Sequence, residues 1–302
     1  MKIFVTGATG YIGSAVATGF ARAGHEVSGL VRSAEKARRL SAAEVRPVVG
    51  SLDDPPSFRA AAEESEVLIH CAVEYSARQW ELHDRVFALF LESARKTGRP
   101  RTIVTTSGVW VYGTTGAVAA SEASPLRLPA MVEPRPAFDQ RVLDANGGPL
   151  RTLVIRPGCV YGERGGLTGS WFESAVSEGA ARLVGDGSNR WAMVHVADLA
   201  DLYVRAVESG AGGELFNATD RSRFTVLDCA RAASLAAGTG GRVVSVPAEE
   251  AAAAMGAPYV ECLLLDQHVD SSKAVRRLGW QPRHGGFADG AGRYFEAWRA
   301  AR

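Results

Sequence analysis

The sequence predicts an α/β fold in which a parallel sheet is covered by helices on both faces. Across residues 1–160, short apolar segments alternate with stretches whose apolar residues recur at helical spacing. The short segments are continuous runs of β-branched or apolar residues and show no strict alternation with polar residues, which is typical of strands buried on both faces. A doubly wound sheet of this kind binds ligands beyond the carboxyl ends of its strands.

The strands and helices of this sheet are expected at regular intervals. The strands are expected at residues 3–6, 26–31, 45–49, 67–71, 102–106 and 152–155. The helices between them are expected near residues 12–23, 34–43, 56–64, 79–96 and 135–146. Beyond residue 160 we expect a glycine-rich loop at 162–169, helices near 170–179 and 197–209, a turn at 185–189 and an aromatic C-terminal helix. We therefore predict a first domain over 1–160, to which the helix near 197–209 returns, and a smaller α/β domain mainly over 161–302.

Composition and charge exclude several classes of partner. The chain has 302 residues, with 34 basic and 33 acidic side chains and a net charge of +1, so it lacks the basic surface of a general nucleic-acid or anionic-membrane binder. It begins with a strand-like segment instead of a basic and apolar leader, and we expect a cytoplasmic protein. The four cysteines form no CxxC pair and the six histidines form no HxxxH or HxH pair. We therefore expect free buried cysteines and no metal site.

The most informative segment runs from Thr6 to Gly13, between the first strand and the first helix. Glycines at a strand-to-helix turn let backbone N–H groups approach a pyrophosphate, and the helix N-terminus adds favourable partial charge. The flanking strand and helix make an ordinary tight turn the weaker interpretation. The residues expected to bind a dinucleotide here are Gly7, Thr9, Gly10, Tyr11, Ile12 and Gly13.

The end of the second expected strand bears on the choice of dinucleotide. An NAD-selective site has a carboxylate about 20 residues after the glycines, where it binds the ribose 2′-hydroxyl. This chain has Arg32 and Ser33 there, and a guanidinium suits a 2′-phosphate. The sequence therefore favours NADP(H) over NAD(H).

Five later segments extend the pattern, at residues 84–95, 107–113, 155–162, 193–200 and 272–282. Together with the TGxxGxxG turn they resemble the extended, here atypical, short-chain dehydrogenase/reductase superfamily, the NAD(P)-dependent epimerase/dehydratase group. Asp84 stands where that family usually has an asparagine at the start of a helix. The resemblance implies a doubly wound parallel Rossmann sheet with a smaller C-terminal substrate-binding domain. It also assigns cofactor contacts to Leu52, Cys71, Ala72, Arg135 and Pro157.

The catalytic part of the resemblance is incomplete. The family uses a Ser or Thr four residues before the tyrosine of its VYG segment, and a Tyr-x-x-x-Lys pair on the next helix. Here the first position is Gly108, with Ser107 one residue early, and the natural register puts Met131 and Arg135 at the tyrosine and lysine positions. Arg135 can replace a lysine as a ribose-binding cation, but an arginine cannot replace a phenol as proton donor.

Other residues could act at the same rim of the sheet. The candidates for catalysis are Ser107, Tyr112 and Tyr75, although the position of each tyrosine is more typical of a packing or rim residue than of a proton donor. The residues expected to line the substrate pocket are Trp80, Trp110, Arg164, Trp191 and Met193. His195 is expected to make a structural hydrogen bond beneath the substrate loop.

Three functions are consistent with these residues. The first is an NADP(H)-dependent oxidoreductase that reduces a small organic molecule without the usual triad. The second is a non-redox cyclase, isomerase or lyase, and the third is a non-catalytic regulator that senses NADP. The expected partners are a small-molecule substrate and, as an open alternative to a monomer, a second copy of the chain in a homodimer.

Overall fold

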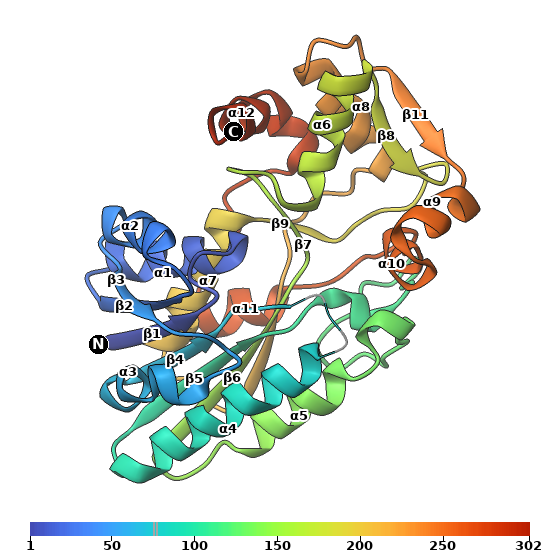
Figure 1. The fold of residues 1–302 in the computed structure, drawn as a ribbon. Helices are drawn as coiled ribbons and strands as arrows, with labels where there is room; N and C mark the ends of the chain where they lie inside the picture. Colours follow the sequence, from blue (N-terminus) through green and yellow to red (C-terminus); the bar gives the residue numbers. More distant parts are fainter. Residues whose placement is uncertain (75, 77) are drawn as a thin grey trace.

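The computed structural model describes residues 1–74, 76 and 78–302. In this part of the chain a central sheet contains seven parallel strands in the order β10-β6-β5-β4-β1-β2-β3 (Figure 1). The strands are β1 (Lys2–Thr6), β2 (Glu26–Val31), β3 (Arg46–Val49), β4 (Val67–His70), β5 (Arg101–Thr106), β6 (Leu150–Pro157) and β10 (Glu214–Ala218). From β1 the chain first adds strands on one side and then, from β4 on, adds strands on the other. The carboxyl ends of β1 and β4 therefore form a topological switch point, where such sheets bind ligands.

Helices cover both faces of this sheet. The helices on the two faces are α1 (Tyr11–Arg22), α2 (Ala34–Ala42), α3 (Arg59–Glu64), α4 (Gln79–Thr97), α5 (Arg135–Asp144), α7 (Val196–Glu208) and α11 (Ser272–Leu278). Successive side chains of β1 serve opposite faces: Ile3 and Val5 belong to the core under α1 and α7, whereas Phe4 packs against Phe58 and Phe90. This arrangement explains the continuous apolar character of the strands.

A smaller unit follows β6. It contains two two-stranded parallel sheets, one of β7 (Cys159–Tyr161) with β9 (Met193–His195) and one of β8 (Ala181–Val184) with β11 (Val243–Val246). Its helices are α6 (Gly169–Glu178), α8 (Val226–Ala236), α9 (Ala248–Met255), α10 (Ala257–Leu263) and α12 (Phe287–Ala300). The apolar faces of α6, α8 and α12 meet in an aromatic core that includes Trp171, Phe172 and Phe287. None of the helices in the described residues has the length and low charge that a bilayer-spanning segment needs.

Short 3₁₀ helices join these elements: η1 (Pro55–Phe58), η2 (Val109–Tyr112), η3 (Ala130–Val132) and η4 (Gly166–Thr168). The prediction of a doubly wound parallel sheet with a smaller α/β unit is confirmed. Sequence patterning missed the edge strand β10, whose short ELFNA segment carries Asn217 within the sheet. Both β10 and α11, which packs on α7 and β10, join the central sheet from beyond residue 160.

Candidate cofactor and substrate site

The glycine-rich turn lies at the switch point between β1 and β4. Gly7 has a φ of +76°, and a Cβ there would lie 2.6 Å from the backbone nitrogen of Ala72, at the end of β4. A Cβ on Gly13 would overlap the carbonyl oxygen of Gly7, which accepts a 2.8 Å hydrogen bond from the N–H of Gly10. Gly10 caps α1 without any side-chain hydrogen bond. The first N–H groups of α1 therefore keep their capacity for an anion such as a pyrophosphate.

The residues next to these glycines stabilise the turn through hydrogen bonds and packing. The hydroxyl of Tyr11 donates a 2.6 Å hydrogen bond to the carbonyl of Gly162, in the glycine-rich loop that follows β7. Ile12 packs against the core, and Thr9 is half-buried. Arg164, from the same loop, donates from a guanidinium nitrogen to the hydroxyl of Ser14 on α1, 2.8 Å away. The structure thus brings Arg164, predicted to contact substrate, against the helix of the cofactor turn.

Four further predicted cofactor contacts lie on or near the carboxyl edge of the sheet. Ala72 abuts Gly7, and Cys71 beside it is hydrogen-bonded by the Thr106 hydroxyl at 3.3 Å. Burial raises the pKa of the Cys71 thiol to about 11, so the thiol is neutral and not a nucleophile at pH 7. Pro157 ends β6 and is buried, and Leu52 packs against the core beside α3 and α4.

Arg32 and Ser33 follow β2. The Ser33 hydroxyl accepts from the N–H of Lys36 at 3.4 Å and so caps α2. Arg32 is exposed. Since none of the ion pairs among the described residues includes Arg32, its guanidinium is available to a ligand.

The segment that should carry the tyrosine–lysine pair has a different local structure. Met131 lies on η3, half-buried against the same apolar cluster as Trp110, and α5 begins only at Arg135. The Arg135 guanidinium donates to the carbonyl of Thr106 at 3.3 Å, and its central carbon lies 5.4 Å from the ring centroid of Trp80. Arg135 and Trp80 are thus brought together at the carboxyl end of β5, where a cation can meet a ligand.

Two of the predicted catalytic residues belong to one buried polar cluster. The Ser107 hydroxyl, directly after β5, donates to Oδ2 of Asp139 at 2.6 Å. The same oxygen accepts from the Arg156 guanidinium at 2.9 and 3.2 Å, and Arg156 also donates to the Tyr112 hydroxyl at 3.2 Å. Tyr112 in turn donates to Oδ1 of Asn217 at 2.9 Å. We call these five residues the buried cluster.

These hydrogen bonds determine whether the hydroxyls of Ser107 and Tyr112 can donate a proton to a substrate. A serine hydroxyl has one proton, and that of Ser107 is directed at Asp139, so Ser107 presents lone pairs and not a proton. The Tyr112 hydroxyl is buried with both of its partners inside the protein, and desolvation raises its pKa. Neither group is set to protonate a substrate in this arrangement. Tyr75, the third candidate, lies outside the described residues.

Sequence reasoning missed a buried histidine pair near this site. The Asp84 side chain is half-exposed and pairs with Arg141, whereas its neighbour His83 is one of the buried residues of α4. Nε2 of His70 lies 2.7 Å from Nδ1 of His83, and Nδ1 of His70 lies 2.6 Å from the Thr6 hydroxyl. Burial lowers both pKa values, that of His83 to about 4. The signal for this pair was the helical spacing of His83 with buried residues three, four and seven positions later.

Of the remaining predicted pocket residues, Trp191 and Met193 lie in the smaller unit and Trp110 lies on η2, after β5. Trp191 stacks on Trp171 with 5.2 Å between centroids, and Met193 is buried on β9. The rings of Trp110 and Tyr259 pack edge to face, with 6.2 Å between their centroids.

The predicted structural hydrogen bond of His195 is present. Its Nδ1 accepts from the N–H of Ala197 and caps α7. The ring stacks on His284 at 3.5 Å, and burial lowers the pKa of His195 to about 4. His195 is therefore a neutral structural residue at pH 7.

Comparison with known proteins agrees with this geometry. The NAD dependent epimerase/dehydratase family matches residues 3–219. An uncharacterized protein of Schizosaccharomyces pombe is 32% identical over 94% of this chain and 96% of its own. A 4-hydroxy-2-methyl-3-oxo-4-farnesyl-3,4-dihydroquinoline-1-oxide ketoreductase of Stigmatella aurantiaca is 30% identical over 73% of this chain and 68% of its own. The crystal structure of a Streptomyces venezuelae dTDP-glucose 4,6-dehydratase has the same fold, with a TM-score of 0.84, 21% identity and coverage of 100% of this chain and 98% of that one. With its glycine turn shaped for a nicotinamide dinucleotide, the chain belongs to the NAD-dependent epimerase/dehydratase family, in the extended short-chain dehydrogenase/reductase superfamily.

Proposed function

We propose that this protein is an NADP(H)-dependent reductase of a small organic molecule. The observation that carries the proposal is the exposed Arg32 at the carboxyl end of β2, in place of the carboxylate that binds a ribose 2′-hydroxyl. Arg32 has no ion-pair partner among the residues described, so pairing with a 2′-phosphate would break no existing contact. The similarity to a bacterial ketoreductase supports a carbonyl-type acceptor.

The roles of the chain's own residues follow from their positions. Bound NADPH would supply the hydride. The glycine turn would hold its pyrophosphate, and Arg135 at the end of β5 would supply the positive charge that a lysine supplies elsewhere in the family. Trp80, in contact with Arg135, would form an apolar wall beside the same site.

The proton donor limits the class of substrate. Because the Tyr112 hydroxyl is buried and Ser107 directs its proton at Asp139, neither assists proton transfer as arranged. A solvent proton is sufficient where the acceptor is already activated, as in an imine or an enone. We therefore propose an activated acceptor of this kind instead of a simple ketone.

The same buried tyrosine favours one other function. A cyclase, isomerase or lyase on this scaffold reduces no carbonyl, so it needs no proton for an alkoxide oxygen formed by hydride transfer, and its turnover would be indifferent to NADPH. The two functions are separated by whether one NADPH is consumed for each product formed.

Calorimetric titration of NADPH and NADH into the protein and its Arg32→Ala variant tests the cofactor assignment. Loss of a charge-assisted phosphate contact is expected to weaken NADPH binding by about ten- to a hundredfold and to leave NADH binding unchanged. Arg22→Ala, at the exposed end of α1, is the matched control and should change neither affinity. Equal wild-type affinities for the two cofactors would contradict the proposal. Loss of NADPH absorbance with a panel of imines, enones and ketones then tests the reaction.

A further inference from the structure

The glycine-rich loop that follows β7 (residues 162–168) packs directly against the first turn of α1. The Tyr11 hydroxyl donates a 2.6 Å hydrogen bond to the carbonyl of Gly162. A Cβ on Gly166 would lie 2.6 Å from Cε1 of Tyr11, so the backbone of this loop also contacts the Tyr11 ring. The loop at the start of the smaller unit is therefore joined to the helix whose N-terminus is expected to bind the cofactor diphosphate.

Arg164 is the cation that this loop brings to α1. One of its guanidinium nitrogens donates to the Ser14 hydroxyl at 2.8 Å, and that hydroxyl donates to the carbonyl of Tyr11 at 3.2 Å. Ser14 stands three residues after the first residue of α1, which is roughly 4.5 Å along the helix axis. The guanidinium therefore contacts the same helical turn whose N–H groups are expected to bind a diphosphate.

The contact with Ser14 leaves most of the hydrogen-bonding capacity of Arg164 unused. A guanidinium has five N–H donors, and the Ser14 hydroxyl is a neutral acceptor for one of them. Arg164 is exposed, and no carboxylate in the described part of the chain lies within 4.0 Å of it. Because hydrogen bonds from a guanidinium to an anion are about twice as strong as those between neutral groups, a nearby phosphate would compete successfully with Ser14.

The neighbouring carboxylate, Glu163, does not take up this guanidinium. Glu163 is exposed, and it has no cationic side chain within 4.0 Å among the residues described. Burial and the charge of Glu163 raise the pKa of Tyr11, whereas the charge of Arg164 lowers it. Both charged side chains thus lie near the Tyr11 hydroxyl, but of the two only Arg164 has a hydrogen bond to α1. Removal of the Glu163 charge should therefore favour an anion at this place.

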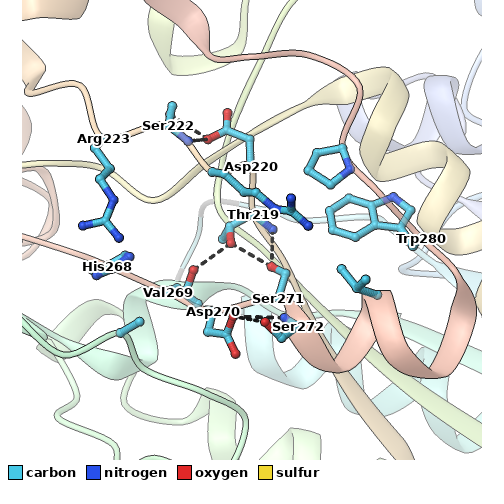
Figure 2. A pocket seen from close by; sticks show the side chains of 14 residues that line it. Thr219, Asp220, Ser222, Arg223, His268, Val269, Asp270, Ser271, Ser272 and Trp280 are labelled. Atoms are coloured by element: carbon cyan, nitrogen blue, oxygen red, sulfur yellow. Dashed lines mark hydrogen bonds between the residues drawn. The ribbon is translucent and has the colours of Figure 1, made fainter.

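Two further arginines lie near the carboxyl edge of the sheet but away from the cofactor turn. Arg221 and Arg223 line a cavity of about 310 Å³ beside the carboxyl end of β10, which β6, β5 and β4 separate from β1 (Figure 2). Asp220 and Asp270 line the same cavity and balance the charge of these arginines. Of the three arginines, Arg164 is the one that contacts α1.

We propose that Arg164 leaves Ser14 when a dinucleotide binds and pairs with the diphosphate at the N-terminus of α1. The inference rests on the dinucleotide binding of the proposed function, but not on its preference for NADP(H), because NADP(H) and NAD(H) contain the same diphosphate. Arg164 then binds cofactor instead of substrate, and it joins the loop at the start of the smaller unit to the bound cofactor.

Calorimetric titration of NADPH, NADH and ADP-ribose into the full chain tests this role. All three ligands contain the diphosphate, and ADP-ribose lacks the nicotinamide. Arg164→Ala should weaken the binding of all three by about tenfold, since each loses a charge-assisted contact. Arg164→Lys keeps the positive charge and should bind each ligand within about threefold of the wild-type affinity. Arg32→Ala, in contrast, should weaken the binding of NADPH alone.

Ser14→Ala is the matched control, because it breaks the same hydrogen bond between Arg164 and Ser14 from the other side. If Arg164 only held α1 in place through Ser14, the two alanine variants would weaken binding equally. We expect Ser14→Ala to bind the three ligands within about twofold of wild type. Glu163→Gln, which removes the neighbouring negative charge, should bind them at least as tightly as wild type.

The outcomes separate this inference from the proposed function. An unchanged affinity of Arg164→Ala for ADP-ribose, or an equal loss of affinity in Ser14→Ala, would overturn the role of Arg164. Equal wild-type affinities for NADPH and NADH would contradict the proposed cofactor preference and leave the role of Arg164 standing. A wild-type protein that binds none of the three ligands would refute both. Circular dichroism of each variant checks that the fold is retained.

Discussion

Replacing Asp139 by alanine should destabilise the protein by about 3–5 kcal/mol, because it leaves a guanidinium buried without its anion. The side chains of Asp139 and Arg156 are 3% and 5% exposed, so water cannot replace the lost contacts. Oδ2 of Asp139 accepts from Arg156 at 2.9 and 3.2 Å and from Ser107 at 2.6 Å. All three of these hydrogen bonds are lost in the variant.

The contacts that remain are too weak to compensate. Arg156 would keep its hydrogen bond to the Tyr112 hydroxyl at 3.2 Å, and a single bond of this kind contributes about 1 kcal/mol. Asp139→Asn keeps an oxygen acceptor of similar size but loses the charge. It should therefore cost less than the alanine variant, about 1–3 kcal/mol.

Equilibrium unfolding in urea measures these differences, since guanidinium chloride would screen the ion pair. The matched control is Asp84→Ala. It breaks the Asp84–Arg141 pair, whose side chains are 51% and 55% exposed, and should cost at most about 1 kcal/mol. If Asp139→Ala loses no more stability than Asp84→Ala, with unchanged denaturant dependence, the assignment of a buried charged cluster is wrong.

Two further predictions concern buried polar groups. Tyr112→Phe should lower the free energy of unfolding, measured in urea, by about 1–3 kcal/mol, because Asn217 and Arg156 lose a hydrogen-bond partner. The same variant should change kcat/KM less than about threefold, since the buried hydroxyl does not reach substrate. A thousandfold loss of kcat/KM would show that Tyr112 is catalytic. As the pH falls from 6.5 to about 4, the protein should lose about 3 kcal/mol of its free energy of unfolding through His83. The pKa of this residue is 6.5 in the unfolded chain and about 4 in the folded protein, so the unfolded chain binds the proton first. Urea unfolding of His83→Gln across this range should show a shallower pH dependence, and an unchanged slope would contradict the lowered pKa.

The fold could be predicted because its signals are local. Each strand of the sheet lies between two helical layers, so a segment such as β1 has consecutive apolar residues, from Ile3 to Val5, and stands out in the sequence. The sequence signal of the glycine turn is equally local, since its glycines stand close together in the sequence and Gly13 approaches the backbone of Gly7. The edge strand β10 carries a weaker signal because the buried polar Asn217 interrupts its apolar residues.

The buried cluster could not be predicted because its members meet only through the tertiary fold. Ser107, Asp139 and Arg156 come from the end of β5, from α5 and from β6, and each looks like an ordinary polar residue in its own segment. The sheet register brings β5 and β6 together, and α5 packs on β6. Ser107 and Tyr112 were therefore predicted to be catalytic from their positions near the end of a strand, whereas their hydrogen-bond partners are set by how α5, β5 and β6 pack together.

Met131→Tyr combined with Arg135→Lys should not create a strong ketone reductase. A Tyr-x-x-x-Lys pair faces one way only when one helix carries both residues a turn apart, and here Met131 lies on η3 while α5 begins at Arg135, with Pro134 between them. The change would also remove the guanidinium from Trp80. NADPH-dependent reduction of simple ketones is expected to rise less than about tenfold, even with Gly108→Ser added to supply a hydroxyl, because a displaced donor loses most of its catalytic advantage. A larger gain, with a pH profile that reports a phenol of lowered pKa, would show that the segment before α5 can refold into a continuous helix and that local structure does not limit catalysis here.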